Sequence, residues 1–265
     1  MRPSFYKRRD VMAIAASISA VMLGSGVYFL NHNNPALQAG EFVTQIGEQK
    51  TIELVDGSSV ILNTGSLIEV AFSKDERGIR LVRGEAYFAV SKDKRRPFVV
   101  YAASSAVKAV GTAFTVRVRS QALEVTVEEG RVALLSIPNP ASAGGDILEN
   151  AAQSPVTELT AGQSVVFDKQ VEDLELMQSA ELNRKLAWRQ GILAYAGDPL
   201  EDVIDDISRY TDLKIEIVDP ALRSLPIGGY FKVGETDALF DSLELTFGIT
   251  VERVHTGYIR LSSGA

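Results

Sequence analysis

The alternation of apolar and polar positions between residues 48 and 136 predicts a series of short β-strands. In TIELVDGSSVIL the alternation continues on both sides of Asp56-Gly57, a dipeptide typical of tight hairpin turns. The same pattern surrounds three further turn signals, at Arg83-Gly84, Glu129-Gly130 and Ala161-Gly162. Short strands that recur with turn signals predict a mainly β domain, folded either as a sandwich or as a β-solenoid.

After residue 190 strand and helix periods are mixed. The stretches GILAYAG, LKIEIV, LPIGGYFKV, ITVERV and GYIRL have the character of strands. Asp198 is the expected N-cap of a helix that begins with Pro199, and Asp237–Phe247 is the second expected helix. One face of the first helix is apolar, with Leu200, Val203, Ile204, Ile207 and Tyr210. The order β-α-β-β-α-β-β predicts a small α+β module at the C-terminus.

Residues 11–30, VMAIAASISAVMLGSGVYFL, form an uncharged apolar run. A helix of that length spans about 30 Å, the thickness of the hydrocarbon core of a bilayer. Basic residues precede the run at Arg2, Lys7, Arg8 and Arg9, and NHNNPALQAGE after it contains none. The positive-inside rule therefore places the N-terminus in the cytoplasm and the bulk of the chain in the periplasm. The alternative is a cleaved signal peptide, but the run is long for one and no A-x-A site follows, which favours an uncleaved anchor.

Composition and charge narrow the possible functions. The chain of 265 residues has a net charge of −7 and no cysteine. Such acidity argues against nucleic acid as a partner. The two histidines, His32 and His255, are far apart, and no nucleophile motif, P-loop or dinucleotide fingerprint is present. The acidic cluster at Glu201, Asp202, Asp205 and Asp206 is interpreted as a solvated helix face. We therefore expect no catalytic residues, no metal and no cofactor.

The patterns divide the chain into six parts. We expect a short cytoplasmic tail over residues 1–10, a transmembrane helix over 11–30, a linker over 31–47, the β domain over 48–170, a connecting helix over 171–190 and the α+β module over 191–265. The connecting helix is expected from the stretch Glu172–Arg189, in which Trp188 is interpreted as a core anchor. Residues 137–153, rich in Pro, Gly, Ala and Asn, are expected to form an exposed loop.

Several blocks in the β region resemble the FecR family of transmembrane sigma-factor regulators. The blocks LVDGSSVILNTGS, LVRGEAYFAV, RRPFVV, AVGTAFTVR, VTVEEGRVAL and LTAGQ occur in the family's order between residues 50 and 168. The last 75 residues resemble the short module shared by secretins and TonB-dependent transporters. The signature positions, which we interpret as structural, are Gly57, Gly84, Glu85, Phe88, Phe98, Gly111, Thr112, Phe114, Gly130 and Gly162.

The resemblance implies a single-span bacterial inner-membrane protein that relays a signal. Its periplasmic part would sense the signalling domain of an outer-membrane TonB-dependent transporter, typically one for a ferric siderophore. Its cytoplasmic part would hold an extracytoplasmic-function sigma factor. Family members usually carry several tens of residues before the span, whereas ten precede it here. The inhibitory domain is therefore expected upstream of the first residue, on another chain, or lost.

Two other classes of function compete with this interpretation. One is an envelope binding or structural protein that uses the same β scaffold without a sigma factor. The other is an envelope enzyme acting on glycans, which would need two carboxylates facing a groove, and the β region shows no convincing pair. If the protein is a signalling adaptor, strand addition to the C-terminal module is the expected contact, through LKIEIV and IGGYFKV. The candidate partner-binding residues are Ile215, Ile217, Ile227, Gly228 and Gly229.

Overall fold

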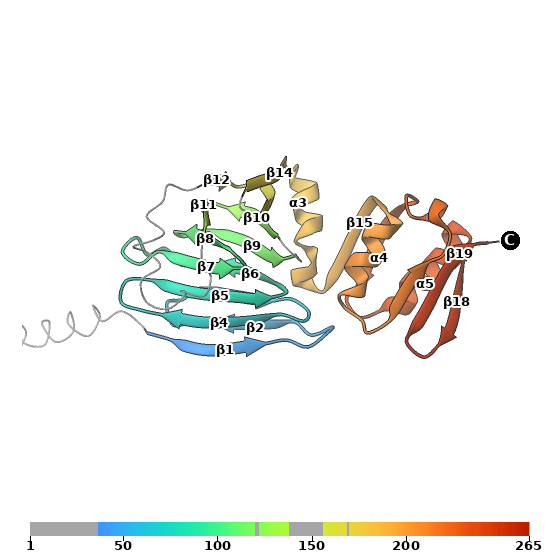
Figure 1. Ribbon diagram of the computed structural model, residues 1–265, viewed down its shortest axis with the longest axis horizontal. Helices are drawn as coiled ribbons and strands as arrows, with labels where there is room; N and C mark the ends of the chain where they lie inside the picture. Colours follow the sequence, from blue (N-terminus) through green and yellow to red (C-terminus); the bar gives the residue numbers. More distant parts are fainter. Residues whose placement is uncertain (1–36, 120–121, 138–155, 169, 265) are drawn as a thin grey trace, which may run out of the picture.

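The computed structural model describes residues 37–119, 122–137, 156–168 and 170–264, which form a β-sandwich followed by a smaller α+β module. Figure 1 shows the two parts side by side along the long axis of the molecule. Between them lie α3 (Ser179–Lys185) and β15 (Ile192–Pro199), and β18 (Ile249–His255) and β19 (Tyr258–Ser263) are at the far end. The expected fold class, mainly β with a C-terminal α+β module, is confirmed.

Within the described ranges the sandwich has two seven-stranded sheets. The first contains, in spatial order, β1 (Ala39–Val43), β4 (Leu67–Phe72), β5 (Arg77–Arg83), β7 (Phe98–Ala102), β8 (Ser105–Ala109), β11 (Arg131–Ser136) and β12 (Thr157–Thr160). The second contains β2 (Lys50–Glu53), β3 (Ser59–Leu62), β6 (Glu85–Ala89), β9 (Ala113–Val118), β10 (Leu123–Glu129), β13 (Gln163–Asp168) and β14 (Gln170–Leu176).

Strand order rises steadily with the sequence in both sheets. The chain therefore crosses between the sheets as it advances, in the manner of a solenoid. Neighbouring strands are nevertheless antiparallel, except for the parallel pair β5 and β7. Apolar side chains from both sheets fill one common core. Of the two expected architectures, the structure has the sandwich.

The four turn signals do not all form hairpins. Asp56-Gly57 joins β2 to β3, which pair antiparallel as predicted. Turns also form at Arg83-Gly84, Glu129-Gly130 and Ala161-Gly162, as predicted, but each of them leads from one sheet to the other. The strands on either side bury their apolar faces against each other across the core, so they are not paired edge to edge. A local pattern marks the reversal but not the sheet that the next strand joins.

Three predicted core phenylalanines meet between the sheets. The rings of Phe88 and Phe114 stack with their centroids 5.2 Å apart, and the ring of Phe98 from the opposite sheet lies 5.8 Å from that of Phe88. All three side chains are fully buried. Aromatic contacts of this kind add to the free energy gained from area burial.

The sandwich also buries the charged side chain of Arg77, which the sequence analysis did not single out. The guanidinium of Arg77 is fully buried and donates to the Asp56 carboxylate at 2.6 Å and to the Ser91 carbonyl at 2.8 Å. It also lies over the ring of Phe98. Because a buried charge is tolerated only when it is paired and hydrogen-bonded, Arg77 fixes the Asp56-Gly57 turn to the core.

The connection between the two parts differs from the continuous helix expected over residues 171–190. Residues Gln170–Leu176 form strand β14, and helical structure is limited to α3 and the 3-10 helix η2 (Ala187–Gln190). β14 forms because it pairs with β13, with Leu174 opposite Val165. Such a long-range contact overrides local helix propensity. Trp188, expected as a core anchor, is buried in the module's core.

The C-terminal module has the predicted order β-α-β-β-α-β-β. After β15 come α4 (Leu200–Ser208), β16 (Lys214–Ile217), the 3-10 helix η3 (Pro220–Leu222), β17 (Pro226–Lys232), α5 (Thr236–Phe247), β18 and β19. β15 pairs with β17, and the other sheet has the order β16-β19-β18. α4 contacts β15, β16 and β17, and α5 contacts β17 and β18, so the helices lie between the two sheets.

The N-cap of α4 differs from the expected one, and two predicted segments lie largely outside the described residues. Asp198 is not the N-cap of α4: Pro199 occupies that position, and the Asp198 carboxylate accepts a hydrogen bond from the Ala196 N–H instead. The predicted membrane span over residues 11–30 lies outside the described residues, and so does the loop predicted over 137–153 except for Ile137, which is buried. Among the residues that are described, none of the helices is long and apolar enough to cross a membrane.

Candidate functional site

The outer sheet of the C-terminal module has an open edge at β16. β16 pairs with β19 alone, so one side of the strand has no neighbouring strand in the described chain. Figure 1 shows the labelled strands of this sheet, β18 and β19, at the end of the molecule away from the sandwich. The sheet to which β16 belongs therefore lies at the end of the molecule away from the sandwich.

The backbone of β16 presents hydrogen-bonding groups to this open side. The N–H of Lys214 donates to the Gly257 carbonyl at 2.8 Å, and that of Val218 donates to the Leu261 carbonyl at 2.9 Å. Because bonding alternates along a strand in a parallel pair, the N–H groups of Ile215 and Ile217 point away from β19. No group in the described residues accepts from either of them. Their side chains are half-buried and pack on the module's core.

The opposite edge of the same sheet is partly closed. In β18 the N–H of Val251 faces outward, and the carboxylate of Glu244 on α5 accepts from it at 3.3 Å. An edge that is already bonded to a side chain is a poorer template for another strand. The two edges of this sheet thus differ, and β16 is the better candidate for pairing with a strand of a partner protein.

The second predicted contact segment, in β17, does not present Ile227 as expected. The N–H of Val233 donates to the Gly191 carbonyl, which places the odd-numbered residues of β17, Ile227 included, on the β15 side of the ladder. The Ile227 side chain is fully buried. Ile227 is thus part of the fold, and a partner could reach only the even-numbered backbone groups of this strand.

The glycine pair in β17 has an explanation within the molecule. A Cβ at Gly229 would lie 3.1 Å from the ring of Phe231, which occupies the space beside it. Gly228 is exposed, and a Cβ there would meet only ordinary contacts. A side chain at Gly229 would therefore press on the ring of Phe231, whereas Gly228 is exposed.

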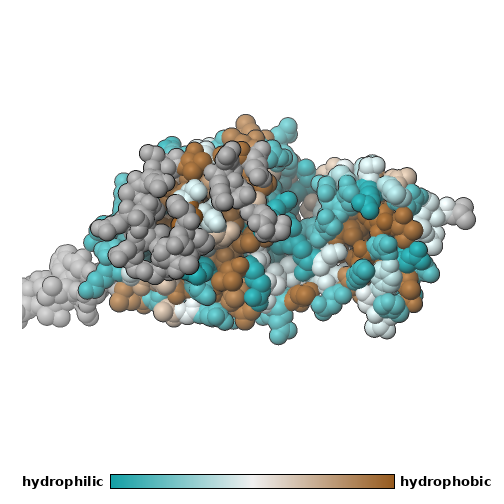
Figure 2. All heavy atoms as spheres, in the orientation of Figure 1, coloured by the Kyte–Doolittle hydropathy of each residue, from teal (hydrophilic) through white to brown (hydrophobic). Residues whose placement is uncertain are grey.

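The module also has large apolar side chains at its surface. Figure 2 shows hydrophobic residues at the surface of the module on the face drawn. The large exposed hydrophobic residues of the module are Val218, Tyr230, Leu245 and Val254. Val218 directly follows β16, so the open edge carries apolar surface at its end.

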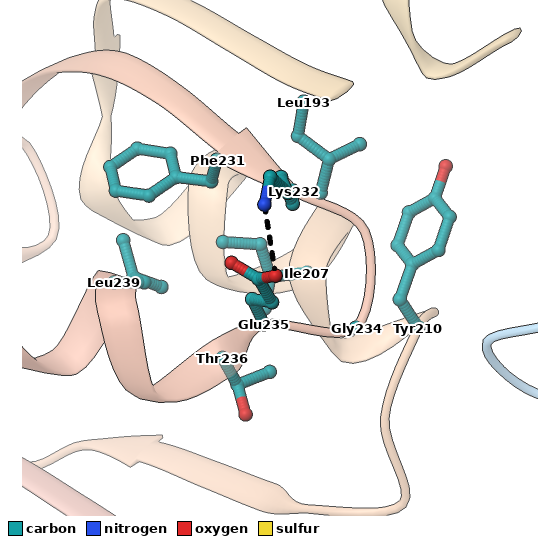
Figure 3. Close-up of a pocket in the computed structure, with 9 residues that line it drawn as sticks. All are labelled: Leu193, Ile207, Tyr210, Phe231, Lys232, Gly234, Glu235, Thr236 and Leu239. Carbon is teal, nitrogen blue, oxygen red and sulfur yellow. Dashed lines mark hydrogen bonds and ion pairs between the residues drawn. The ribbon is translucent and has the colours of Figure 1, made fainter. Parts of the chain in front are cut away.

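A hollow in the module is too small for a ligand. It lies between β15, α4, β17 and α5 and is lined mainly by apolar groups such as Leu193, Phe231 and Leu239, while Lys232 and Glu235 form an ion pair beside it (Figure 3). Its volume of about 10 Å³ is about what one water molecule needs. Sites for small organic molecules are of the order of 300–1,000 Å³. The described residues also contain no cluster of three or more side chains suited to a metal ion.

The predicted signature positions lie in turns and in the sandwich core. Gly57, Gly84, Gly111, Gly130 and Gly162 all have positive φ angles. At Gly84 a Cβ would lie 2.2 Å from the Ser66 Oγ, so any side chain would displace that buried serine. At Gly130 a Cβ would lie 2.8 Å from the Cγ2 of Thr112, which is itself buried. These positions are scaffold positions and none of them lies at the β16 edge.

Sequence reasoning missed the junction between sandwich and module, which is rich in charge. Arg189 donates to both carboxylate oxygens of Glu128 at 2.9 Å and lies over the ring of Tyr87. Burial and the hydrogen bond to Glu128 raise the pKa of Tyr87 to about 12. Burial acts to raise the pKa of Glu128 as well, but hydrogen bonds from Arg189 and Tyr87 outweigh it and lower that pKa. No local signal marks these residues, because they meet only when the two parts dock.

Comparisons with known proteins find a family match within the sandwich and a similar fold over most of the chain. Residues 40–133 match the family model described as FecR protein. Two crystal structures of a candidate anti-sigma factor from Parabacteroides distasonis ATCC 8503 share the fold, with TM-scores of 0.65 and 0.66 at 24% sequence identity. The alignments cover 86% and 85% of this chain and 100% of the crystallised chains. No curated protein sequence matches.

Proposed function

We propose, from the premise that residues 40–133 of this chain are a FecR domain, that the protein is a regulator of the anti-sigma class. The family match supports a regulatory role, and the likeness of fold to a candidate anti-sigma factor extends over sandwich and module together. In this proposal the chain is anchored in the bacterial inner membrane by residues 11–30, and its described part lies in the periplasm. An extracytoplasmic-function sigma factor is the partner on the cytoplasmic side.

The periplasmic partner is the signalling domain of a TonB-dependent transporter, for which a ferric siderophore is the expected cargo. The observation that carries this part of the proposal is the open edge of β16, which has two outward N–H groups. The sheet that contains this strand has β18 and β19 at the end of the molecule away from the sandwich (Figure 1). An edge strand binds an added strand through backbone hydrogen bonds, and side-chain pockets supply specificity.

The proposal is tested by calorimetry. The fragment 37–265 is titrated with the purified signalling domain of the transporter whose gene neighbours that of this chain, and with the signalling domain of an unrelated transporter as a control. We expect saturable binding to the first domain alone. If neither domain binds while circular dichroism shows a folded fragment, the transporter part of the proposal is wrong. A sigma-factor gene beside this one would still support the regulatory part.

A further inference from the structure

The sandwich and the module meet through a buried polar junction. At the end of α4, Arg209 donates to the Glu85 carboxylate at 2.6 Å, and the Asn63 side chain donates to the Tyr210 hydroxyl at 2.7 Å. Asn63 also donates to Glu85 at 3.0 Å, so the four side chains form one network. Asn63, Glu85 and Tyr210 are buried. Burial acts to lower the pKa of Arg209, but the Glu85 carboxylate outweighs it and raises that pKa.

The network continues from the module to the strand nearest the N-terminus. The Thr44 hydroxyl donates to the Asn63 carbonyl at 2.6 Å and accepts from the Ser66 N–H at 2.9 Å. The Ser66 hydroxyl in turn donates to the Glu85 carbonyl at 3.0 Å. Thr44 directly follows β1, and both Thr44 and Ser66 are buried. A continuous path of buried hydrogen bonds therefore joins Arg209 of the module to the end of β1.

A second path runs through the segment after β1. The Gly47 N–H donates to the Thr64 hydroxyl at 2.8 Å, and that hydroxyl donates to the Arg209 carbonyl at 2.8 Å. The side chain of Gln49 donates to the Trp188 carbonyl, also at 2.8 Å. Residues 44–49 thus contact the module directly as well as through the sandwich.

Apart from this junction, β1 is held by its pairing with β4 and by Phe42, which packs on the sandwich core. It is an edge strand that pairs only with β4, and four of its five residues are exposed, Phe42 being half-buried. Hydrogen bonds in a buried network depend on one another, because a lost partner leaves the remaining polar groups unsatisfied in a region without water. Removal of the module from this junction would leave the Asn63 amide without Tyr210 and the Glu85 carboxylate without Arg209. It would also take the Arg209 carbonyl from Thr64 and the Trp188 carbonyl from Gln49, and so weaken the attachment of the segment that follows β1.

We propose that the junction is a coupling device, in which docking of the C-terminal module on the sandwich holds β1 in the sheet and undocking releases it. β1 is the described element closest in sequence to residues 11–30. Docking or undocking of the module would therefore change how firmly the chain is held next to that N-terminal segment. Release of an edge strand is a local order-disorder transition, a common form of switch. The proposal rests on the described contacts alone and holds whichever partner the module binds.

Hydrogen exchange of the full-length chain tests the coupling. Arg209→Met removes the guanidinium, Thr44→Val removes the hydroxyl at the other end of the path, and Arg223→Met is the matched control on an exposed arginine of the module. Because coupling is reciprocal, each of the first two variants should raise amide exchange in both segments 39–46 and 203–212. The expected rise is about tenfold, the factor that corresponds to one buried hydrogen bond. Arg223→Met should change neither segment.

The proposal is overturned if Arg209→Met raises exchange only in 203–212 and Thr44→Val only in 39–46. Exchange in β10, an interior strand of the second sheet, shows whether a variant has unfolded as a whole. If Arg209→Met raises exchange there too, Tyr210→Phe replaces it, because it removes a single hydroxyl from the same network. A rise with Tyr210→Phe in 203–212 without one in 39–46 would then refute the coupling.

Discussion

Phe114 is buried at the contact between the two sheets, with its ring stacked on that of Phe88. We expect Phe114→Ala to lower the free energy of unfolding of the fragment 37–265 by about 3–5 kcal/mol, because it removes buried area and leaves a cavity. Urea denaturation followed by circular dichroism measures the loss. Tyr230→Ala is the control, since that ring is 77% exposed and its removal should cost less than about 0.5 kcal/mol. A loss below about 1 kcal/mol at Phe114 would contradict its place in the core.

Glu124 ties the connecting helix to the sandwich. Its carboxylate accepts from Arg119 at 2.6 Å and lies 2.5 Å from the ammonium of Lys185 on α3. Burial alone would raise the pKa of Glu124, but Lys185 and Arg119 outweigh it and lower the pKa from 4.5 to about 2. A lowered folded-state pKa gives stability that is fully present above about pH 4.5 and is lost as the pH falls toward 2.

We therefore expect Glu124→Gln to lower the free energy of unfolding at pH 7 by up to about 3 kcal/mol, and to lower it less at pH 3. Urea denaturation of the fragment 37–265 at the two pH values measures the difference. Glu158→Gln is the matched control, because its pair with Arg131 is exposed and should be worth under about 1 kcal/mol. An equal effect of Glu124→Gln at both pH values would show that the carboxylate is not held ionised by its partners.

At the scale of elements, β16 is the strand on which the proposed partner contact depends. Ile215→Pro removes an N–H that faces the open side and leaves the bonds to β19 in place. We expect this variant to weaken binding of the transporter signalling domain by about tenfold or more, since at least one backbone hydrogen bond is lost. Calorimetry on the fragment 37–265 measures the change.

Arg253→Pro is the matched control for that variant. It places a proline at an outward position of β18, the opposite edge of the same sheet, and should leave the affinity unchanged. Circular dichroism must show that both variants are folded. Full affinity of folded Ile215→Pro, or equal weakening by both prolines, would direct the search for the contact to other surfaces.

The periodicity of the chain predicted most elements, but not how distant elements meet. The apolar faces of α4 and α5 follow from local spacing, so the order of the module was predictable. The turns at Gly84 and Gly130 were also predictable, yet the sheet that follows each turn depends on packing across the core. No local pattern marks Asn63 and Arg209, whose side chains both reach the Glu85 carboxylate only in the folded molecule. The open side of β16 could not be predicted from local spacing either, because it depends on which side of the strand β19 occupies.

At the scale of the whole molecule, the proposed function requires the described residues to lie in the periplasm. The basic residues before the run at 11–30, and their absence just after it, support this topology. We expect alkaline phosphatase fused after Gly40 to be active in a bacterial host, because that enzyme folds only outside the cytoplasm. A reporter active only in the cytoplasm, fused at the same position, should be inactive. The reverse result would place the module on the wrong side of the membrane for a transporter.

The most direct test of the account is whether the β16 edge controls the sigma factor in living cells. A transcriptional reporter of the neighbouring sigma factor is measured with and without the transporter's substrate, in cells that produce the wild-type chain, Ile215→Pro or Arg253→Pro at equal levels in the membrane. We predict that the substrate changes reporter activity with the wild-type chain and with Arg253→Pro, and that Ile215→Pro abolishes the response. A normal response with Ile215→Pro would contradict the claim that this edge receives the signal.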